Sequence, residues 1–416
     1  MNNRHSVTLD LSKCKGCTNC IKRCPTEAIR VRNGHAVIQE DKCIDCGECI
    51  RLCPYKAKKA TYDKFSDFEH YKYKIALPAP TLYGQFEELD DVDYILTALL
   101  ECGFDAVYEV SKAAELVTDY TRQYMKQADL PKPMISSACP AIVRLISLRF
   151  PCLVDNLLPI MPPIEYAARE ARKEALREHP ELKDEDICVL FISPCPAKIS
   201  YIKNPIGVSY TAVTGGLAMS DFYFKLRSKR KEIENPKSLS STGIIGLNWA
   251  GSGGEATSIL TDKYLAADGI ENCIKILDEI ENGTMNDLDF VELNACIGGC
   301  VGGTLTVENP FIAKARLRSL RKYLPISMNH IEAGATSDDV LYDAIIDGNQ
   351  ASMLSEDRST AIAKMAEIEK IYKTLPHLDC GSCGAPNCHA LAEDVIRNDA
   401  NIEDCLIRLR EQQHKI

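Results

Sequence analysis

The middle of the chain alternates short apolar runs with longer amphipathic stretches. The apolar runs predict β-strands at 74–80, 104–110, 187–193, 243–247 and 290–295. The amphipathic stretches predict helices at 92–101, 141–149 and 164–177. Pro-Pro at 162–163 and Gly-Gly at 215–216, 253–254 and 302–303 predict turns. Strands that alternate with helices indicate an α/β domain of parallel sheets flanked by helices.

The two ends of the chain lack this alternation. The first 63 residues are short of apolar runs and rich in cysteine, which indicates a separate small domain. The charged segment 355–375 predicts a helix with one apolar stripe, made of Ile362, Met365, Ile368 and Ile371/Tyr372. We therefore expect an N-terminal domain at 1–63, an α/β domain at 70–352, and a connecting helix with a small C-terminal domain at 353–416.

The composition limits the function. The chain has 416 residues, a formal charge of −10, 45% hydrophobic and 26% charged residues, which is typical of a globular protein. The negative charge disfavours nucleic acid and anionic membrane as partners, and no apolar run reaches the roughly 18–20 residues that span a bilayer. The polar start runs directly into a cysteine motif, which predicts no signal peptide and a cytoplasmic location. Because a reducing compartment disfavours disulfides, the 20 cysteines indicate metal ligation.

Eight cysteines form a tandem repeat near the N-terminus. The pattern Cys-x2-Cys-x2-Cys-x3-Cys-Pro occurs twice, at Cys14, Cys17, Cys20 and Cys24 and again at Cys43, Cys46, Cys49 and Cys53. This spacing resembles the bacterial two-cluster ferredoxins, in which the fourth cysteine of each run ligates the other cluster. The resemblance implies a small ferredoxin-like α+β domain. It also implies one 4Fe-4S cluster on Cys14, Cys17, Cys20 and Cys53, and a second on Cys43, Cys46, Cys49 and Cys24. A zinc site, with four ligands, does not account for the doubled spacing.

Four more cysteines lie near the C-terminus, at Cys380, Cys383, Cys388 and Cys405. Glycines and a proline predict a tight loop between the first three, and 390–397 predicts a helix that leads to the fourth. Four thiolates suit either zinc or a 4Fe-4S cluster. The string CGSCGAPxC resembles the small iron–sulfur domain of several electron-transfer and corrinoid proteins, which favours a third 4Fe-4S cluster. We expect His389 to face solvent.

Three further loops carry cysteines directly after apolar runs. They are SSACPA (136–141), SPCPAK (193–198) and NACIGGCVGG (294–303), with Cys139, Cys195, Cys296 and Cys300. Because chemistry in parallel α/β folds lies beyond the carboxyl ends of strands, we expect these four cysteines to converge on one pocket. Any one of them alone is better explained as a buried core cysteine beside a turn, but three such loops in one chain weaken that interpretation. The remaining cysteines, interpreted as core or surface residues, are Cys102, Cys152, Cys188 and Cys273.

These three loops, in this order, resemble the signature loops of the iron-only (FeFe) hydrogenases. The resemblance covers roughly residues 8–350. It implies that the four loop cysteines hold the cubane of an H-cluster, and that Cys300 bridges to a diiron unit carrying carbon monoxide, cyanide and an azadithiolate. It also implies that Lys198 donates a hydrogen bond to a cyanide ligand, and that Pro78 and Ala79 contact the same ligands, in a looser alignment.

Three positions in these loops depart from the catalytic members of the family. The first of two adjacent cysteines, which relays protons there, is replaced by Ala138, which has no titratable group. Two methionines that pack around the diiron unit are replaced by Ser193 and Asn294, which makes the pocket more polar.

The rest of the family's proton relay is altered as well. Its serine is replaced by Pro162, and its acidic pair is replaced within VTDYT (117–121). Asp119 and Glu165 remain as alternative acids. These departures predict slow proton transfer.

The departures and the C-terminal cysteines together resemble the sensory branches of the family. We interpret the chain as a slow FeFe hydrogenase that interconverts H2 with protons and electrons, relays electrons through 4Fe-4S clusters and senses H2 or redox state. One alternative is a dedicated sensor with negligible turnover. Another is an iron–sulfur assembly factor without a diiron unit, which Lys198 and the double ferredoxin motif disfavour. Expected partners are H2, protons and a ferredoxin-like electron carrier or a signalling protein, and a homodimer is left open.

Overall fold

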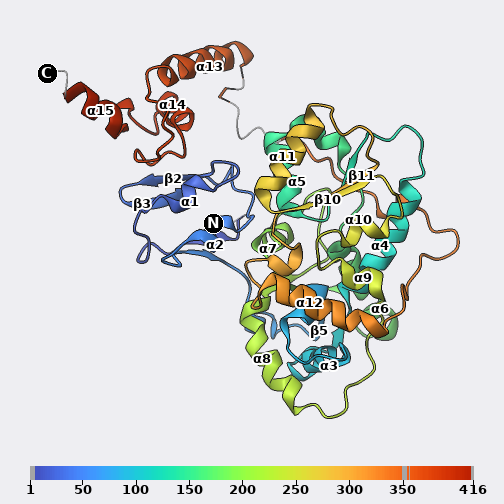
Figure 1. Cartoon of the computed structure of the whole chain (residues 1–416). Coiled ribbons are helices and arrows are strands. Elements are labelled where there is room, and N and C mark those ends of the chain that lie inside the picture. The colour runs from blue at the N-terminus through green and yellow to red at the C-terminus, as the bar shows by residue number, and fades with distance from the viewer. Residues whose placement is uncertain (1–4, 349–353, 356, 414–416) are drawn as a thin grey trace. The chain divides into compact units, whose positions relative to one another are not determined.

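The computed structural model describes residues 5–348, 354, 355 and 357–413. They form two compact units (Figure 1). One unit contains the chain up to Ser6 together with Thr61–Asp347, and the other contains Val7–Ala60 and the chain from Gly348 onward. The two cysteine-rich segments, one near each end of the chain, therefore belong to the same unit. The predicted boundary at 352/353 lies outside the described residues.

The first unit is built on two parallel sheets. The larger has the order β6-β5-β8-β9 and consists of β5 (Tyr73–Pro78), β6 (Ala106–Val107), β8 (Ile187–Ser193) and β9 (Gly215–Ala218). The smaller has the order β10-β11-β7 and consists of β7 (Met134–Ile135), β10 (Tyr264–Asp268) and β11 (Phe290–Asn294). Every residue of β8 is buried, as expected for a strand covered on both faces. The predicted α/β class is confirmed.

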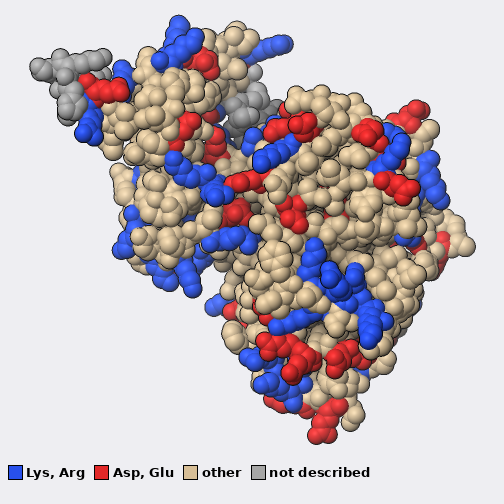
Figure 2. Space-filling model, viewed as in Figure 1, with Lys and Arg blue, Asp and Glu red and all other residues tan. Residues whose placement is uncertain are grey.

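Helices cover these sheets. They are α3 (Asp93–Glu101), α4 (Val110–Tyr124), α5 (Pro140–Arg149), α6 (Pro163–Glu178), α7 (Pro196–Lys203), α8 (Met219–Glu232), α9 (Ile244–Asn248), α10 (Gly254–Ser258), α11 (Ile270–Glu281) and α12 (Pro310–Leu320). Four of them, α5, α6, α7 and α12, begin with proline, whose missing N–H costs nothing at a first helical position. The three predicted helices are confirmed as α3, α5 and α6. Figure 2 shows Lys and Arg side chains gathered over α12, so the net negative charge is unevenly distributed.

Some local predictions in this unit were wrong. Of the predicted strand 243–247, residues 244–247 belong to a helix, α9. The Glu115 carboxylate accepts from the N–H of Gly243, the residue before this helix, at 2.7 Å and so satisfies the helix start. Gly215 and Gly216 lie inside β9 instead of a turn. A Cβ on Gly215 would lie 2.3 Å from Phe68, so close packing is what requires glycine there.

Strand prediction also failed at short or half-exposed segments. Only Ala106 and Val107 of the run 104–110 are in a strand, and Val110 already begins α4. Strands β7, β9 and β10 were not predicted. Strand β7 has only two residues and β10 is at most half-buried, so neither shows a clear alternation of apolar and polar residues.

The second unit contains the two cysteine-rich ends. Its N-terminal part, the ferredoxin-like domain, has antiparallel pairs β1 (Val7–Leu9) with β4 (Lys58–Ala60) and β2 (Ile29–Arg32) with β3 (His35–Ile38), and helices α1 (Asn19–Lys22) and α2 (Glu48–Leu52). Its C-terminal part contains α13 (Arg358–Tyr372), α14 (Cys388–Ile396) and α15 (Leu406–Gln413). The predicted helix before the last cysteines is α13. Its apolar stripe is not a buried face, because Ile368 is buried but Ile362 and Met365 are each 59% exposed.

Candidate metal centres

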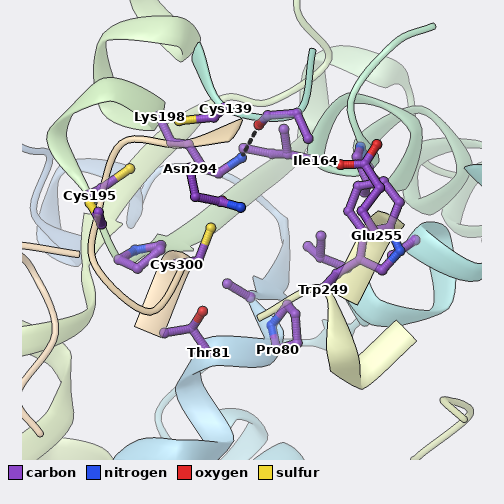
Figure 3. A pocket seen from close by; sticks show the side chains of 18 of the residues that line it. Pro80, Thr81, Cys139, Ile164, Cys195, Lys198, Trp249, Glu255, Asn294 and Cys300 are labelled. Carbon is purple, nitrogen blue, oxygen red and sulfur yellow. Dashed lines mark hydrogen bonds between the residues drawn. The ribbon is translucent and has the colours of Figure 1, made fainter. Parts of the chain in front are cut away.

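The three cysteine loops of the first unit meet in one pocket, as the sequence predicts. Cys139, Cys195, Cys296 and Cys300 all line it. These loops follow β7, β8 and β11, and because all three strands run in parallel sheets, their carboxyl ends deliver the thiols to a common site. In Figure 3, Cys139, Cys195 and Cys300 lie on one side of the pocket, opposite Trp249 and Glu255.

The pocket thiols are set up to hold metal. Burial raises the pKa of the Cys195 thiol, and it raises the pKa of the Cys300 thiol to about 12. The positive charge of Lys198 lowers both pKa values, but burial outweighs it. Buried thiols of this kind stay protonated and inert unless a cation stabilises the thiolate. A set of four thiols fits an iron–sulfur cubane or a zinc ion.

Lys198 lies in the same pocket. Its ammonium donates a hydrogen bond to the Ala138 carbonyl at 3.1 Å. No carboxylate among the described residues is within ion-pair distance of Lys198. The pocket around its ammonium is lined mostly by apolar groups. A cation in such surroundings favours an anionic group in the pocket.

The other expected site residues divide into two sets. Ala79, Ala138 and Asn294 line the pocket, whereas Pro78 and Ser193 do not. Ser193 ends β8, and its hydroxyl donates to the Cys195 carbonyl at 2.9 Å, so it shapes the loop.

The alternative acids lie outside the pocket. The Asp119 carboxylate pairs with Arg122 and His330, each at 2.9 Å. The Glu165 carboxylate accepts from Thr211 at 2.6 Å and from Arg169 at 2.9 Å. Both acids are therefore held by ion pairs away from the cysteines, and neither lines the pocket.

Two pocket acids, Glu255 and Glu292, were missed by the sequence analysis. Each is 4% exposed. Burial and then the neighbouring Glu292 raise the pKa of Glu255 to about 8, and burial raises the pKa of Glu292. The Ser136 hydroxyl donates to Glu255 at 2.5 Å, and the Ala138 N–H is 3.3 Å from the Ser136 oxygen. This shift favours the protonated form of Glu255, which lies close to Ala138, the position that lacks the thiol. In the sequence, the only feature that points to Glu255 is its position directly after the Gly-Gly pair at 253–254.

The cysteine repeat at the N-terminus is also a structural repeat. Left-handed backbone recurs at positions 29 residues apart, in the pairs Gly16 and Asp45, Thr18 and Gly47, and Glu27 and Lys56. The cysteine before proline accepts a backbone N–H in each half, Ala28 to Cys24 and Ala57 to Cys53, both at 3.2 Å. Cys24 lines one cavity with Cys43, Cys46 and Cys49, which is the quartet that the resemblance assigns to the second cluster.

A buried cation adjoins both quartets. Lys58 is 2% exposed, and its ammonium has no hydrogen-bond partner among the described residues. The positive charge of Lys58 lowers the pKa of Cys20 and Cys53 in one quartet and of Cys49 in the other, whereas burial raises the pKa of all three thiols. An uncompensated buried charge is strongly unfavourable. Two anionic clusters held by these cysteines would compensate it, so the residues present fit both.

The C-terminal cysteines lie together as well. Cys383, Cys388 and Cys405 share one packed core. Burial raises the pKa of Cys383, and the nearby thiols Cys405 and Cys380 raise it further. His389 is exposed, as predicted. Four thiols in one place fit a metal site here too.

The remaining cysteines are accounted for without metal. Cys102, Cys188 and Cys273 are buried and Cys152 is exposed. The Cys273 thiol donates to the Asn294 carbonyl at 3.3 Å.

The comparisons with known families agree with this arrangement. Residues 72–206 and 201–304 match the family described as "Iron only hydrogenase large subunit, C-terminal domain". Residues 6–54 match a 4Fe-4S dicluster domain and residues 375–407 match a putative Fe-S cluster domain. The first match spans more than half of the chain, so the chain belongs to the iron-only hydrogenase family.

Individual relatives are distant. The periplasmic [Fe] hydrogenase large subunit of Nitratidesulfovibrio vulgaris is 24% identical over 367 residues, which cover 72% of this chain and 86% of that one. Iron hydrogenase 1 of Clostridium pasteurianum is 25% identical over 378 residues, covering 72% of this chain and 64% of that one. The solved structure of a variant [FeFe]-hydrogenase of Chlamydomonas reinhardtii gives a TM-score of 0.49 at 16% identity over 67% of this chain and 89% of that one. The family assignment does not rest on this last overlap.

None of the helices in the described ranges is long and apolar enough to cross a bilayer. The cytoplasmic location stays a sequence-based prediction.

Proposed function

We propose that this protein is an FeFe hydrogenase that interconverts H2 with protons and electrons slowly, in an H2- or redox-sensing role. One observation carries the proposal: a single pocket collects four cysteines, a lysine with no ion-pair partner among the described residues, and a buried carboxylic acid whose pKa is raised. Membership of the iron-only hydrogenase family supports the reaction class.

The four pocket cysteines would hold the cubane of an H-cluster, with Cys300 as the bridge to the diiron unit. When bound, this cofactor would supply the redox chemistry of H2. Lys198 would donate from its ammonium to a cyanide ligand, a charge-assisted hydrogen bond that is strong in an apolar pocket. Ala79 and Asn294 would lie against the same ligands, and Pro78 and Ser193 would position the loops that carry them.

Proton handling would fall to Glu255. Its pKa is raised by burial and by the neighbouring Glu292, and Ser136 holds its carboxyl group by the hydrogen bond at 2.5 Å. Ala138 supplies no titratable group between this acid and the cysteines. A single weak acid replaces a chain of relay groups, which is the reason to expect slow turnover.

Electrons would pass through three 4Fe-4S clusters. Their ligands would be the two N-terminal quartets, Cys14, Cys17, Cys20 and Cys53 with Cys43, Cys46, Cys49 and Cys24, and the C-terminal set Cys380, Cys383, Cys388 and Cys405. The external partner would be a ferredoxin-like electron carrier or, in a sensor, a signalling protein.

Infrared spectroscopy of the matured protein tests the cofactor. We expect stretching bands of bound carbon monoxide and cyanide, and we expect Lys198→Ala to shift the cyanide bands because the hydrogen-bond donor is removed. Lys203→Ala, at the exposed end of α7, is the matched control and leaves the bands in place. A matured protein with full iron content and no such bands would favour the assembly-factor alternative and end the hydrogenase proposal.

Restoring the missing thiol tests the proton argument. We expect Ala138→Cys to raise H2 evolution, because it places a thiol at the residue whose backbone N–H already contacts the Ser136 hydroxyl, and that hydroxyl contacts Glu255. The increase should disappear in the double variant Ala138→Cys/Glu255→Gln, in which the thiol has no acid to exchange protons with. Turnover measured with a reduced viologen dye checks this. An unchanged rate in Ala138→Cys, with intact infrared bands, would show that proton transfer at position 138 does not limit turnover.

A further inference from the structure

The C-terminal cysteine domain is bound to the ferredoxin-like domain by a buried ion pair. The Asp394 carboxylate accepts two hydrogen bonds from the Arg30 guanidinium, at 2.6 and 2.9 Å, and a third from Arg32 at 2.7 Å. Arg30 is 3% exposed and Asp394 is 1% exposed. Figure 1 shows α14, which carries Asp394, next to β2, which carries both arginines. A buried pair with this bidentate geometry is costly to break from either side.

A second ion pair has the same arrangement, with the positive charge on the ferredoxin-like domain and the negative charge on the C-terminal domain. The Lys42 ammonium lies 3.0 Å from the Glu393 carboxylate, and the two side chains are 11% and 17% exposed. Although burial raises the pKa of Glu393, the charges of Lys42 and Arg397 outweigh it and hold that pKa below its usual value. The ferredoxin-like side of the contact is basic and the C-terminal side is acidic, so the charges fix one orientation.

Backbone contacts bring the metal-binding loops themselves together. The Val31 N–H on β2 donates to the Gly384 carbonyl at 2.8 Å, so the C-terminal loop covers the strand edge. A Cβ on Gly384 would lie 2.0 Å from the Val31 carbonyl oxygen, which leaves room for glycine only. Arg32 donates to the Cys383 carbonyl at 3.2 Å, and the Lys22 ammonium donates to the Asp379 carbonyl at 2.6 Å.

These contacts join two loops that each carry cysteines. Lys22 belongs to α1, which also carries Cys20 of one N-terminal quartet. Asp379 and Cys383 flank Cys380 in the C-terminal set. The Asn387 amide, just before Cys388, donates to Glu27 at 2.6 Å, three residues after Cys24. The C-terminal thiols are therefore held against the first N-terminal cysteine loop, not on a separate module.

We infer that the C-terminal cluster is a docked electron-transfer partner of the ferredoxin-like clusters in the same chain, with Asp394 as the residue that positions it. The inference rests on the proposed function only in that these cysteines hold 4Fe-4S clusters. The C-terminal cluster starts reduced, gives up one electron and becomes oxidised. The ferredoxin-like cluster that takes up this electron starts oxidised and becomes reduced. No bond forms or breaks and no proton is needed. A signalling protein that reads this chain would then read a cluster already in electronic contact with the other two.

Electron paramagnetic resonance of the full chain tests this. The chain is loaded with iron and sulfide but not with the diiron unit, and then fully reduced with dithionite. We expect magnetic coupling beyond that of a Cys380→Ser/Cys383→Ser variant, which keeps the two ferredoxin-like clusters and the pocket cubane but lacks the C-terminal cluster. Asp394→Lys should lose this additional coupling while retaining its iron, because it places a third positive charge against Arg30 and Arg32. The exposed Glu411→Lys makes the same charge change away from the contact and should leave the coupling intact.

A charge exchange supplies the rescue. Lys42→Glu should weaken the additional coupling, and the double variant Lys42→Glu/Glu393→Lys should restore it. Hydrogen exchange on the unaltered chain needs no variant, and the Val31 amide should exchange slowly. Rapid exchange of that amide, or a reduced wild-type spectrum equal to that of the Cys380→Ser/Cys383→Ser variant plus an isolated cluster, would overturn the inference. Because no diiron unit is present in the sample, a failure of the hydrogenase proposal leaves this result unaffected.

Discussion

Glu255→Gln is expected to lower H2 turnover of the matured protein about 10²-fold, the scale on which a positioned acid or base contributes. Glutamine keeps the shape of the side chain, and its amide oxygen can still accept from the Ser136 hydroxyl, but it cannot release or take up a proton. The loss should therefore appear in turnover while the infrared bands of the cofactor stay in place. H2 evolution and H2 oxidation should fall together, because the same acid serves both directions.

The control for this substitution is Asp119→Asn. Asp119 is also an acid of the first unit, but its carboxylate pairs with Arg122 and His330 and does not line the pocket. Its removal should leave turnover nearly unchanged. Glu255→Asp should recover part of the rate because it restores a titratable group. If Glu255→Gln turns over as fast as the unaltered protein with intact infrared bands, the protons reach the pocket by another route.

The same carboxyl group should make the stability of the metal-free chain depend on pH. Its pKa is raised in the fold from the usual 4.5 to about 8, so the folded chain keeps a proton that the unfolded chain releases. The contribution of Glu255 to stability is therefore full below about pH 4.5 and is lost progressively as the pH rises toward the raised pKa. Above that pH the folded chain must bury a charged carboxylate. Glu292, whose pKa is also raised by burial, acts in the same direction.

Denaturant unfolding of the unaltered chain and of Glu255→Gln at pH 5 and pH 9 measures this effect. The neutral amide has no proton to lose, so Glu255→Gln should gain stability relative to the unaltered chain on going from pH 5 to pH 9. Groups too far from Glu255 to feel its charge titrate alike in both proteins and cancel in the difference, whereas the neighbouring Glu292 contributes together with Glu255. An equal difference in unfolding free energy at the two pH values would mean that the folded chain does not raise the pKa of Glu255.

The errors of the sequence analysis have a common physical cause. Residues 243–247 are apolar enough for a strand, but the carboxylate of Glu115, from another helix, satisfies the start of a helix there. Gly215 and Gly216 suggest a turn, but Phe68 and Ile199 pack so closely that a strand with glycine is the arrangement that fits. In both cases a contact with a distant residue outweighs the local preference.

The sequence by itself determined the cysteine quartets and the α/β class. Ligand spacing is a local property, since one tight loop must supply three thiols, and strands that share parallel sheets must deliver their following loops to one edge. Only the tertiary structure decided which charged groups meet these cysteines: Glu255 beside Ala138, Lys58 between the N-terminal quartets, and Asp394 against Arg30 and Arg32. These residues are far apart in sequence, and each has an ordinary polar side chain until burial removes the water around it. Their chemistry follows from that burial, which no local pattern of residues encodes.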